Sequence, residues 1–464
     1  MTPLRRLQSC AALSGVLACL SGLPAAAQMT LDAAGMRQAA TQALRTGDAA
    51  RARVFAEALL KRDPEDLNAH LIHARALRDL GHIPPARTAA RRAWHLANTD
   101  AEKYSAALIT AQVLSSAGKR TRAQLWLRRA SQHAPNDLLK ARAKRDFRYV
   151  KQRNPWHTSL SFTLAPNSNI NNGSARDRSE LNYAISEILF GQPIEYNLGG
   201  SAVALSGLEF GGALRMRYRF HETPTTAHDL KAALSYRSFA LSGSARNTAP
   251  DASGGDFAFG TASLGYGFQQ INFARKGEFS FDLEAGQSWY GGARYASHLR
   301  AGVYQSYRPS RDKRYRFGVD VEKQFGQATP DVDTLTLSGN LTQRLSAGDT
   351  LFLGLSAAAS RSIEKDAEYG EIELRSGYVL AKPVMGASLQ FGLGAALRDY
   401  DVSRHSAQGR QDRKLFADVT ATFTQIDYYG FNPSLTLSAS KTDSNIGLYD
   451  VNRVGLSIGI KSAF

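Results

Sequence analysis

The chain has 464 residues with 57 Lys and Arg against 41 Asp and Glu, which gives a formal net charge of +16. Both of its cysteines, Cys10 and Cys19, stand near the N-terminus, so the sequence after them has no disulfide framework, cysteine nucleophile or cysteine metal site. Beyond the N-terminal segment there is no run of about 18 apolar residues, so we expect no membrane-spanning helix.

Residues 1–27 have the pattern of a processing segment. Arg5 and Arg6 precede an apolar run, and Ala25-Ala26-Ala27 supplies the small residues of a cleavage site. We interpret the segment as the signal peptide of a Gram-negative envelope protein. Two alternatives are a membrane anchor, which the shortness of the run disfavours, and lipidation of Cys19.

Residues 28–154 carry a helical repeat. A glycine, an alanine five residues later and a proline twelve residues after that occur as Gly47, Ala52, Pro64 and again as Gly118, Ala123, Pro135, while the middle unit has Gly81 and Ala86 without the proline. Glycine suits the turn between two helices, alanine lets the helices approach closely, and proline stops the second helix. This pattern resembles the tetratricopeptide repeat, so we predict a short α-solenoid.

The solenoid segment is strongly basic, with 24 Lys and Arg against 11 Asp and Glu. A concave basic face could receive an acidic segment of a client protein or anionic lipid heads. The alternatives are a solvated helix surface and a solenoid that only braces its neighbour. Nucleic acid is not expected, because no aromatic platform accompanies the arginines. The candidates for client binding are Arg87, Arg91, Arg92, Arg122, Arg128 and Arg129.

Residues 155–464 change to short alternating segments divided by Gly, Asp, Asn and Pro. In FSFDLEA, Phe279, Phe281 and Leu283 share one face, and Asp282 and Glu284 share the other. Charges on a strand fit a wet interior whose opposite face meets lipid, as in outer-membrane barrels. A soluble β-sandwich is the alternative. At about 20–25 residues for each strand with its loops, we predict an antiparallel transmembrane β-barrel of about 14 strands.

The last strand supports a barrel most strongly. In VNRVGLSIGIKSAF an alternating apolar face ends in Phe at the final residue. This is the pattern of bacterial outer-membrane barrels that are handed to the barrel insertion machinery. The residues of this C-terminal signal are Leu456, Ile458, Ile460 and Phe464. We therefore expect that machinery and outer-membrane lipid among the partners.

Two motifs carry a family resemblance. APNSNINNG, residues 165–173, resembles the Ala-Pro-Asp/Asn-Ser-Asn-Ile/Val-Asn signature of the Slam family, the surface lipoprotein assembly modulators. The tail YGFNPSLTLSASKTDSNIGLYDVNRVGLSIGIKSAF is similar to that family's ending. The resemblance implies a 14-stranded outer-membrane translocon, with its repeats in the periplasm, that exports surface lipoproteins or soluble secreted proteins. The repeat domain is short for the family, which leaves the class of client open.

An even number of strands puts both ends of the barrel on one side, so the first and last strands are neighbours. We therefore predict that Ser168-Asn169-Ile170 and Ser444-Asn445-Ile446 lie close together on the other rim. Either they brace the outer mouth functionally, or they are turns that fix the register. Segment 174–204 is either a helical plug or an outer loop. The residues of this translocation and seam motif are Pro166, Asn167, Ser168, Asn169, Ile170, Asn171, Asn172, Ser444, Asn445, Ile446, Leu448, Tyr449, Asn452 and Arg453.

No catalytic motif is present, and His70 and His73, three residues apart, are read as ordinary helix residues, so we expect no enzyme, no metal and no cofactor. The preferred function is protein export by a monomeric barrel. The alternatives are an exopolysaccharide exporter with a helical-repeat scaffold, and a passive pore.

Overall fold

A computed structural model describes residues 31–462. The predicted cleavage site, Cys19 and Phe464 lie outside the described residues. The chain divides into two compact units, one that extends to Ala97 and one that spans Asn98–Phe464. The predicted division near residue 154 followed charge and pattern, whereas the contacts group the last three helices with the strands.

The N-terminal part is helical throughout. Its helices are α1 Ala33–Arg45, α2 Ala49–Arg62, α3 Leu67–Asp79, α4 Ile83–Leu96, α5 Asp100–Ser116, α6 Arg120–Gln132 and α7 Asp137–Arg153. Asp48, Asp66, Thr99 and Asn136 cap α2, α3, α5 and α7 with their side chains. No helix within residues 31–462 combines the length and apolar character needed to cross a membrane.

The repeat residues occupy the predicted places. Gly47, Gly81 and Gly118 adopt φ angles of +87°, +81° and +73° in the turns within the helix pairs, a conformation that a side chain disfavours. Ala52, Ala86 and Ala123 are fully buried where the paired helices meet. The tetratricopeptide-like fold predicted for this region is confirmed.

Fourteen antiparallel strands close into a barrel in the order β1-β16-β15 and onward down to β4, which pairs with β1, so the predicted strand number is confirmed. The strands are β1 Trp156–Asn167, β4 Gly207–Glu222, β5 Thr226–Leu241, β6 Phe259–Asn272, β7 Gly277–Tyr290, β8 Ala293–Tyr307, β9 Lys313–Gly326, β10 Val332–Arg344, β11 Thr350–Arg361, β12 Gly370–Val379, β13 Ala387–Tyr400, β14 Arg410–Phe423, β15 Phe431–Ser444 and β16 Val451–Ser462.

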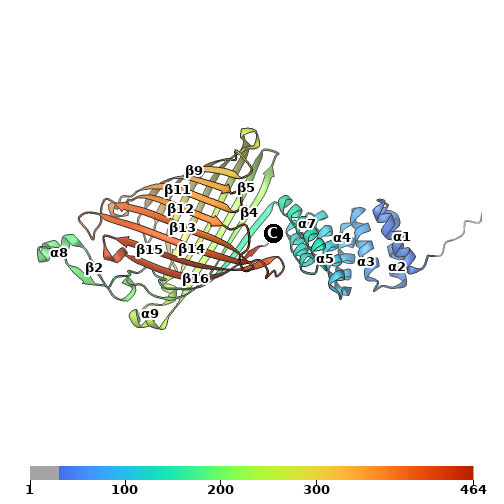
Figure 1. Ribbon diagram of the computed structural model, residues 1–464, viewed down its shortest axis with the longest axis horizontal. Coiled ribbons are helices and arrows are strands. Elements are labelled where there is room, and N and C mark those ends of the chain that lie inside the picture. The colour runs from blue at the N-terminus through green and yellow to red at the C-terminus, as the bar shows by residue number, and fades with distance from the viewer. Residues whose placement is uncertain (1–30, 463–464) are drawn as a thin grey trace, which may run out of the picture. The chain divides into compact units, whose positions relative to one another are not determined.

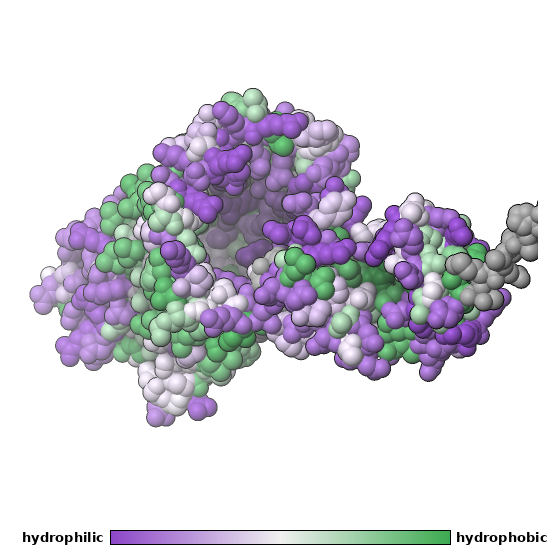
Figure 2. Space-filling model, turned by 45° about the vertical axis from the view of Figure 1, so that its right-hand side comes forward, coloured by the Kyte–Doolittle hydropathy of each residue, from purple (hydrophilic) through white to green (hydrophobic). Residues whose placement is uncertain are grey.

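The register gives the barrel a polar face and an apolar face. Asp282 pairs with Gly302, and Gly302 pairs with Asp320, so charged residues follow one face from β7 to β9. The neighbouring apolar positions, such as Leu283 and Val319, are exposed on the other face. Figure 2 shows the hollow of the barrel lined mainly by hydrophilic residues, while hydrophobic residues gather on the outer wall.

We call the rim where β1 begins and β16 ends the near rim, and the opposite one the far rim. Between β1 and β4 the chain forms a far-rim insert with β2 Arg178–Glu180, α8 Tyr183–Phe190 and β3 Glu195–Asn197; α9 Gly243–Thr248 follows β5. Figure 1 shows α8 and β2 beyond the ends of the strands. Of the two alternatives for segment 174–204, this position favours an outer loop.

Candidate functional site

The seam between β1 and β16 is the least regular junction in the barrel. Every residue of β1 pairs with β4, from Trp156 opposite Tyr218 to Asn167 opposite Gly207. Toward β16, only Leu164 opposite Ile458 and Asn167 opposite Gly455 are in register. Pro166 adds to this irregularity, because it has no N–H to donate to either neighbour. The barrel therefore closes here over a short stretch near the far rim.

Side chains hold the seam where the backbone pairing ends. Ser168 exchanges two hydrogen bonds with Val454: its N–H donates to the carbonyl oxygen at 3.0 Å, and its Oγ accepts from the Val454 N–H at 2.8 Å. Arg453 donates from Nε to the Asn169 carbonyl oxygen at 3.0 Å and from its terminal nitrogen to Asn172 Oδ1. We call Ser168, Asn169, Asn172, Arg453 and Val454 the seam clasp.

Asn169 is the centre of the clasp, and its side chain is fully buried. Its Nδ2 donates to the carbonyl oxygens of Gly173 at 2.8 Å and Asn452 at 3.2 Å, and its Oδ1 accepts from the Gly173 N–H at 3.0 Å. Asn167 Oδ1 accepts from the Asn169 N–H at 2.9 Å. One amide thus joins the end of β1 to the start of β16, a task for which an asparagine side chain supplies both a donor and an acceptor.

The next residues of the motif fasten the far-rim insert. Asn171 Nδ2 donates to the Ser201 and Val203 carbonyl oxygens at 2.8 and 2.9 Å, and its Oδ1 accepts from the Leu205 N–H at 2.9 Å. Ile170 is buried against Leu205. A Cβ at Gly173 would collide with the Val203 carbonyl oxygen, so this position requires glycine.

The second motif lies on the same rim, one strand further round. Asn445 Oδ1 accepts from the Gln411 N–H at 2.8 Å, and its Nδ2 donates to the Gly409 carbonyl oxygen at 3.1 Å, so it secures β15 to the approach of β14. Ser444 donates its N–H to Asp450 Oδ1 at 2.6 Å, and Ile446 is buried.

The two Ser-Asn-Ile segments are joined through the insert and not directly. Ser174 Oγ donates to the Gly447 carbonyl oxygen at 2.7 Å, and the Leu448 N–H donates to Ser179 Oγ at 2.9 Å. Arg176 pairs with Asp450, which the sequence reasoning missed although both residues flank the motifs. The Arg410 guanidinium lies over the Tyr449 ring, with its central carbon 3.4 Å from the ring centre.

At the near rim, Arg128 anchors α6 to the barrel. The guanidinium donates to the carbonyl oxygens of Tyr429 at 3.0 Å and Gly430 at 2.8 Å, and to Ser462 Oγ at 2.8 Å. It also stacks on Phe431, 4.1 Å from the ring centre. Only 9% of Arg128 is exposed, so its side chain is committed to the barrel and does not belong to an open client-binding surface.

A second contact supports this anchor. Asp427, in the turn before β15, lies 3.1 Å from Lys140 Nζ and 3.7 Å from Lys144 Nζ. Burial alone would raise the pKa of Asp427, but the hydrogen bond and charge of Lys140, the N–H of Gly430 and the charge of Lys144 outweigh it and lower the pKa. Burial lowers the pKa of the Arg128 guanidinium, and Asp427 opposes that effect.

The remaining predicted arginines keep more exposure. Arg129 stacks on the Trp126 ring at 4.4 Å, and Arg92 pairs with Glu65 at 2.9 Å. Arg91 and Arg122 are exposed, and Arg87 is half-buried. The positions of Arg87, Arg91 and Arg92 lie in the first compact unit, and those of Arg122 and Arg129 lie in the second.

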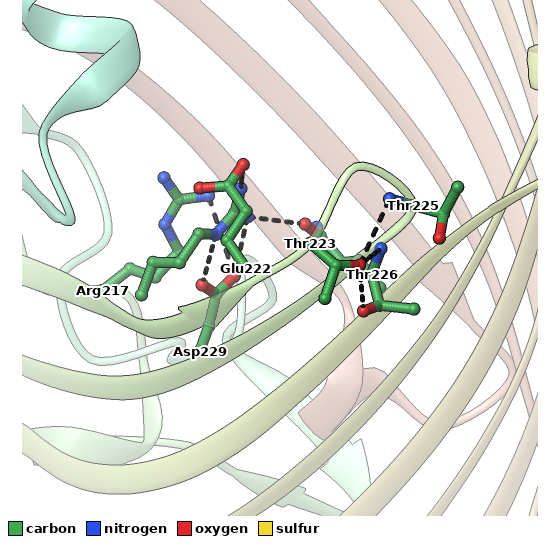
Figure 3. A network of polar contacts seen from close by, with 8 residues as sticks. Arg217, Glu222, Thr223, Thr225, Thr226 and Asp229 are labelled. Carbon is green, nitrogen blue, oxygen red and sulfur yellow. Dashed lines mark hydrogen bonds and ion pairs between the residues drawn. The ribbon is translucent and has the colours of Figure 1, made fainter.

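The polar wall is built from cross-strand ion pairs. Figure 3 shows Asp229 beside Arg217 at the β4–β5 turn, next to the turn residues Thr223 and Thr226. The buried Asp229 lies 3.8 Å from Arg217 and accepts a hydrogen bond from Arg219 Nε at 2.9 Å. Comparable cross-strand pairs follow round the barrel, with Arg300–Asp320 at 2.9 Å and Arg398–Glu371 at 2.7 Å. Within β14, Arg410 also pairs with Asp412, at 2.6 Å. In the part of the chain that the structure describes, no group of three acidic, His or Cys side chains could hold a metal ion.

Comparison with known proteins gave one family. Residues 238–464, just under half of the chain, match the family described as "Surface lipoprotein assembly modifier". The matched range includes the second motif and the C-terminal strand, and it begins after APNSNINNG. No curated protein matches the chain significantly.

Solved structures give similarities to helical-repeat proteins. The Yersinia enterocolitica type III secretion translocator chaperone SycD has 16% identity and a TM-score of 0.24, over 27% of this chain and 88% of that one. The TPR2B domain of yeast Sti1, in a complex with an Hsp70 peptide, has 18% identity and a TM-score of 0.24, over 26% of this chain and 97% of that one. The first TPR domain of human RPAP3 has 16% identity and a TM-score of 0.23, over 26% and 90%.

The barrel fold and this family are those of an outer-membrane assembly or transport protein. The resemblance inferred from the sequence motifs is confirmed by the match of residues 238–464 to the surface lipoprotein assembly modifier family.

Proposed function

We propose that this protein is an outer-membrane translocon that carries surface lipoproteins or soluble secreted proteins to the cell surface. The observation that supports the proposal most directly is the family match across a closed barrel with a polar inner wall. A polar wall with balanced ion pairs offers hydrogen bonds to a passing polypeptide without attracting one sign of charge strongly.

We place the near rim on the periplasmic side. Helix α7 leads into β1 at that rim, and the barrel begins and ends there, as in other barrels of even strand number. The solenoid then receives the client before export. Arg91, Arg92, Arg122 and Arg129 are the exposed candidates for an acidic client segment, whereas Arg128 serves as the anchor.

The test is the surface and supernatant proteome of a deletion strain against its complemented parent, with protease shaving of intact cells. We expect one or a few proteins to be lost from the outside and to accumulate in the periplasm. An unchanged protein profile with loss of an extracellular polymer would contradict protein export and would favour the polysaccharide exporter. Unchanged proteins and polymers would favour a passive pore.

The client protein, outer-membrane lipid and the barrel insertion machinery are the proposed partners, and the proposed working state is a monomer. Cross-linking of intact cells, followed by size analysis of the tagged chain, tests the monomer. A ladder of multiples of the chain mass would contradict it.

A further inference from the structure

An apolar groove of about 690 Å³ crosses the seam on the outer wall. It is lined by Pro166 of β1, Leu208 of β4, Leu437 of β15, and Val454 and Leu456 of β16. The last four side chains are all exposed on the apolar face of the barrel. The groove therefore lies on the lipid side and adjoins the seam clasp, with which it shares Ser168 and Val454.

Between this groove and the near rim, the seam is open to separation. Residues 156–163 of β1 have no register partner on β16 within the described chain, although residues 459–462 of β16 extend far enough to face part of that stretch. Both faces of β1 are exposed there, the polar one at Ser159 and Ser161 as well as the apolar one, where Leu160 and Phe162 are 57% and 62% exposed. An unpaired strand edge is a place where another molecule can enter a sheet.

A lipoprotein presents a physical difficulty to a closed barrel. Its polypeptide can follow the polar lumen, but its acyl chains would have to leave hydrocarbon for a wall of ion pairs, and each methylene moved into that surrounding is unfavourable. A seam that parts sideways removes the difficulty, because the chains then stay on the outer wall while the polypeptide occupies the lumen.

We propose that the β1–β16 seam is a lateral passage, and that the groove across it holds the acyl chains of the lipoprotein during export. This inference rests on the proposed function and names the class of client for which the seam is built. The seam clasp closes the far-rim end of the passage, because Arg453 and Asn169 join β1 to β16 there. The two strands separate along the stretch between the clasp and the near rim.

The binding test uses the purified full chain in vesicles of phosphatidylethanolamine and phosphatidylglycerol, with a synthetic triacylated lipopeptide that carries a photoreactive diazirine in one acyl chain. We expect photoadducts concentrated at residues 160–166 and 454–460. Excess unlabelled lipopeptide should abolish them. A diazirine phospholipid that gives the same adduct pattern, or lipopeptide adducts spread evenly round the barrel, would overturn the proposal and would describe ordinary lipid contact.

A disulfide lock tests the opening. Leu164→Cys with Ile458→Cys joins a register pair across the seam, and Val319→Cys with Leu337→Cys joins a pair with similar exposure on β9 and β10 as the control. No other cysteine occurs after Cys19. Under oxidation, we expect the seam lock, and not the control lock, to lose the lipopeptide adducts and to regain them with a reductant. Adducts that persist in the oxidised seam lock would overturn the proposal.

The same variants separate this inference from the proposed function in cells. If deletion of the protein leaves the surface proteome unchanged, protein export fails, while the vesicle experiment still decides whether the seam binds acyl chains. If deletion removes a surface lipoprotein but the oxidised seam lock still displays it, export stands and the lateral passage is overturned.

Discussion

Removal of the Asn169 side chain should weaken the barrel more than the loss of any exposed amide. The substitution Asn169→Ala deletes three hydrogen bonds of 2.8, 3.2 and 3.0 Å and leaves the Gly173 N–H without its partner in a buried place. At about 1 kcal/mol for each net hydrogen bond, the loss in the free energy of unfolding is about 3 kcal/mol. Asn169→Asp should cost more, because a carboxylate would face the two carbonyl oxygens.

The assay is urea unfolding of the full chain in phosphatidylcholine vesicles, with the folded fraction measured from the gel mobility of unheated samples. Asn197→Ala is the matched control, since Asn197 is exposed in the same far-rim insert and its side chain has no hydrogen bond among those described. A loss of less than about 0.5 kcal/mol for Asn169→Ala, within the range of surface substitutions, would refute the view that this amide holds the seam.

Three further predictions concern the rims. Arg128→Ala should lower the free energy of unfolding by about 3 kcal/mol and expose the α7–β1 junction to trypsin. Urea unfolding and timed digestion measure these two effects, and substitution of the exposed Arg122 by Ala should cause neither. Because the pKa of Asp427 is lowered from 3.8, its contribution to the free energy of unfolding is fully present above pH 3.8 and is lost as the pH falls through the lower folded pKa. The difference in the free energy of unfolding between the unchanged chain and Asp427→Asn should therefore be constant near neutrality and vanish in strong acid. Burial, with the charge of Arg404, lowers the pKa of His405 from 6.5, and the neutral ring accepts a hydrogen bond at Nδ1 from the Asn182 N–H at 3.1 Å. Acidification below pH 6.5 should therefore loosen the far-rim insert, which hydrogen exchange measures as a faster rate at Asn182. His405→Gln should remove this pH dependence.

Sequence periodicity predicted the fold well because each part has one dominant signal. The spacing of Gly47, Ala52 and Pro64 reflects how two helices turn and pack, and these are local requirements. Alternation in FSFDLEA follows from a wall with lipid on one side and polar groups on the other. Chain length then fixed the number of strands closely, because a membrane strand has a narrow range of lengths.

The contacts of the candidate site were predictable only in part. Strand parity placed the two Ser-Asn-Ile motifs on one rim, but no periodicity encodes that Arg176 pairs with Asp450, since the insert between them folds through its own turns. Composition made Arg128 look like one of many surface arginines. Its burial depends on how α6 meets the turn before β15, and sequence spacing does not describe such a contact.

The Arg128 anchor and the seam clasp tie the two sides of the seam together at opposite rims. Arg128 grips the start of β15 and the end of β16 through Gly430 and Ser462, while α7 leads directly into β1, so the last helices hold both sides of the seam at the near rim. The clasp holds both sides at the far rim. Between these ties β1 has one fully paired neighbour, β4, whose turn to β5 is stiffened by the buried Asp229. Strain applied at the near rim, for example by a client bound to the helices, would therefore separate β1 from β16 before any other pair of strands.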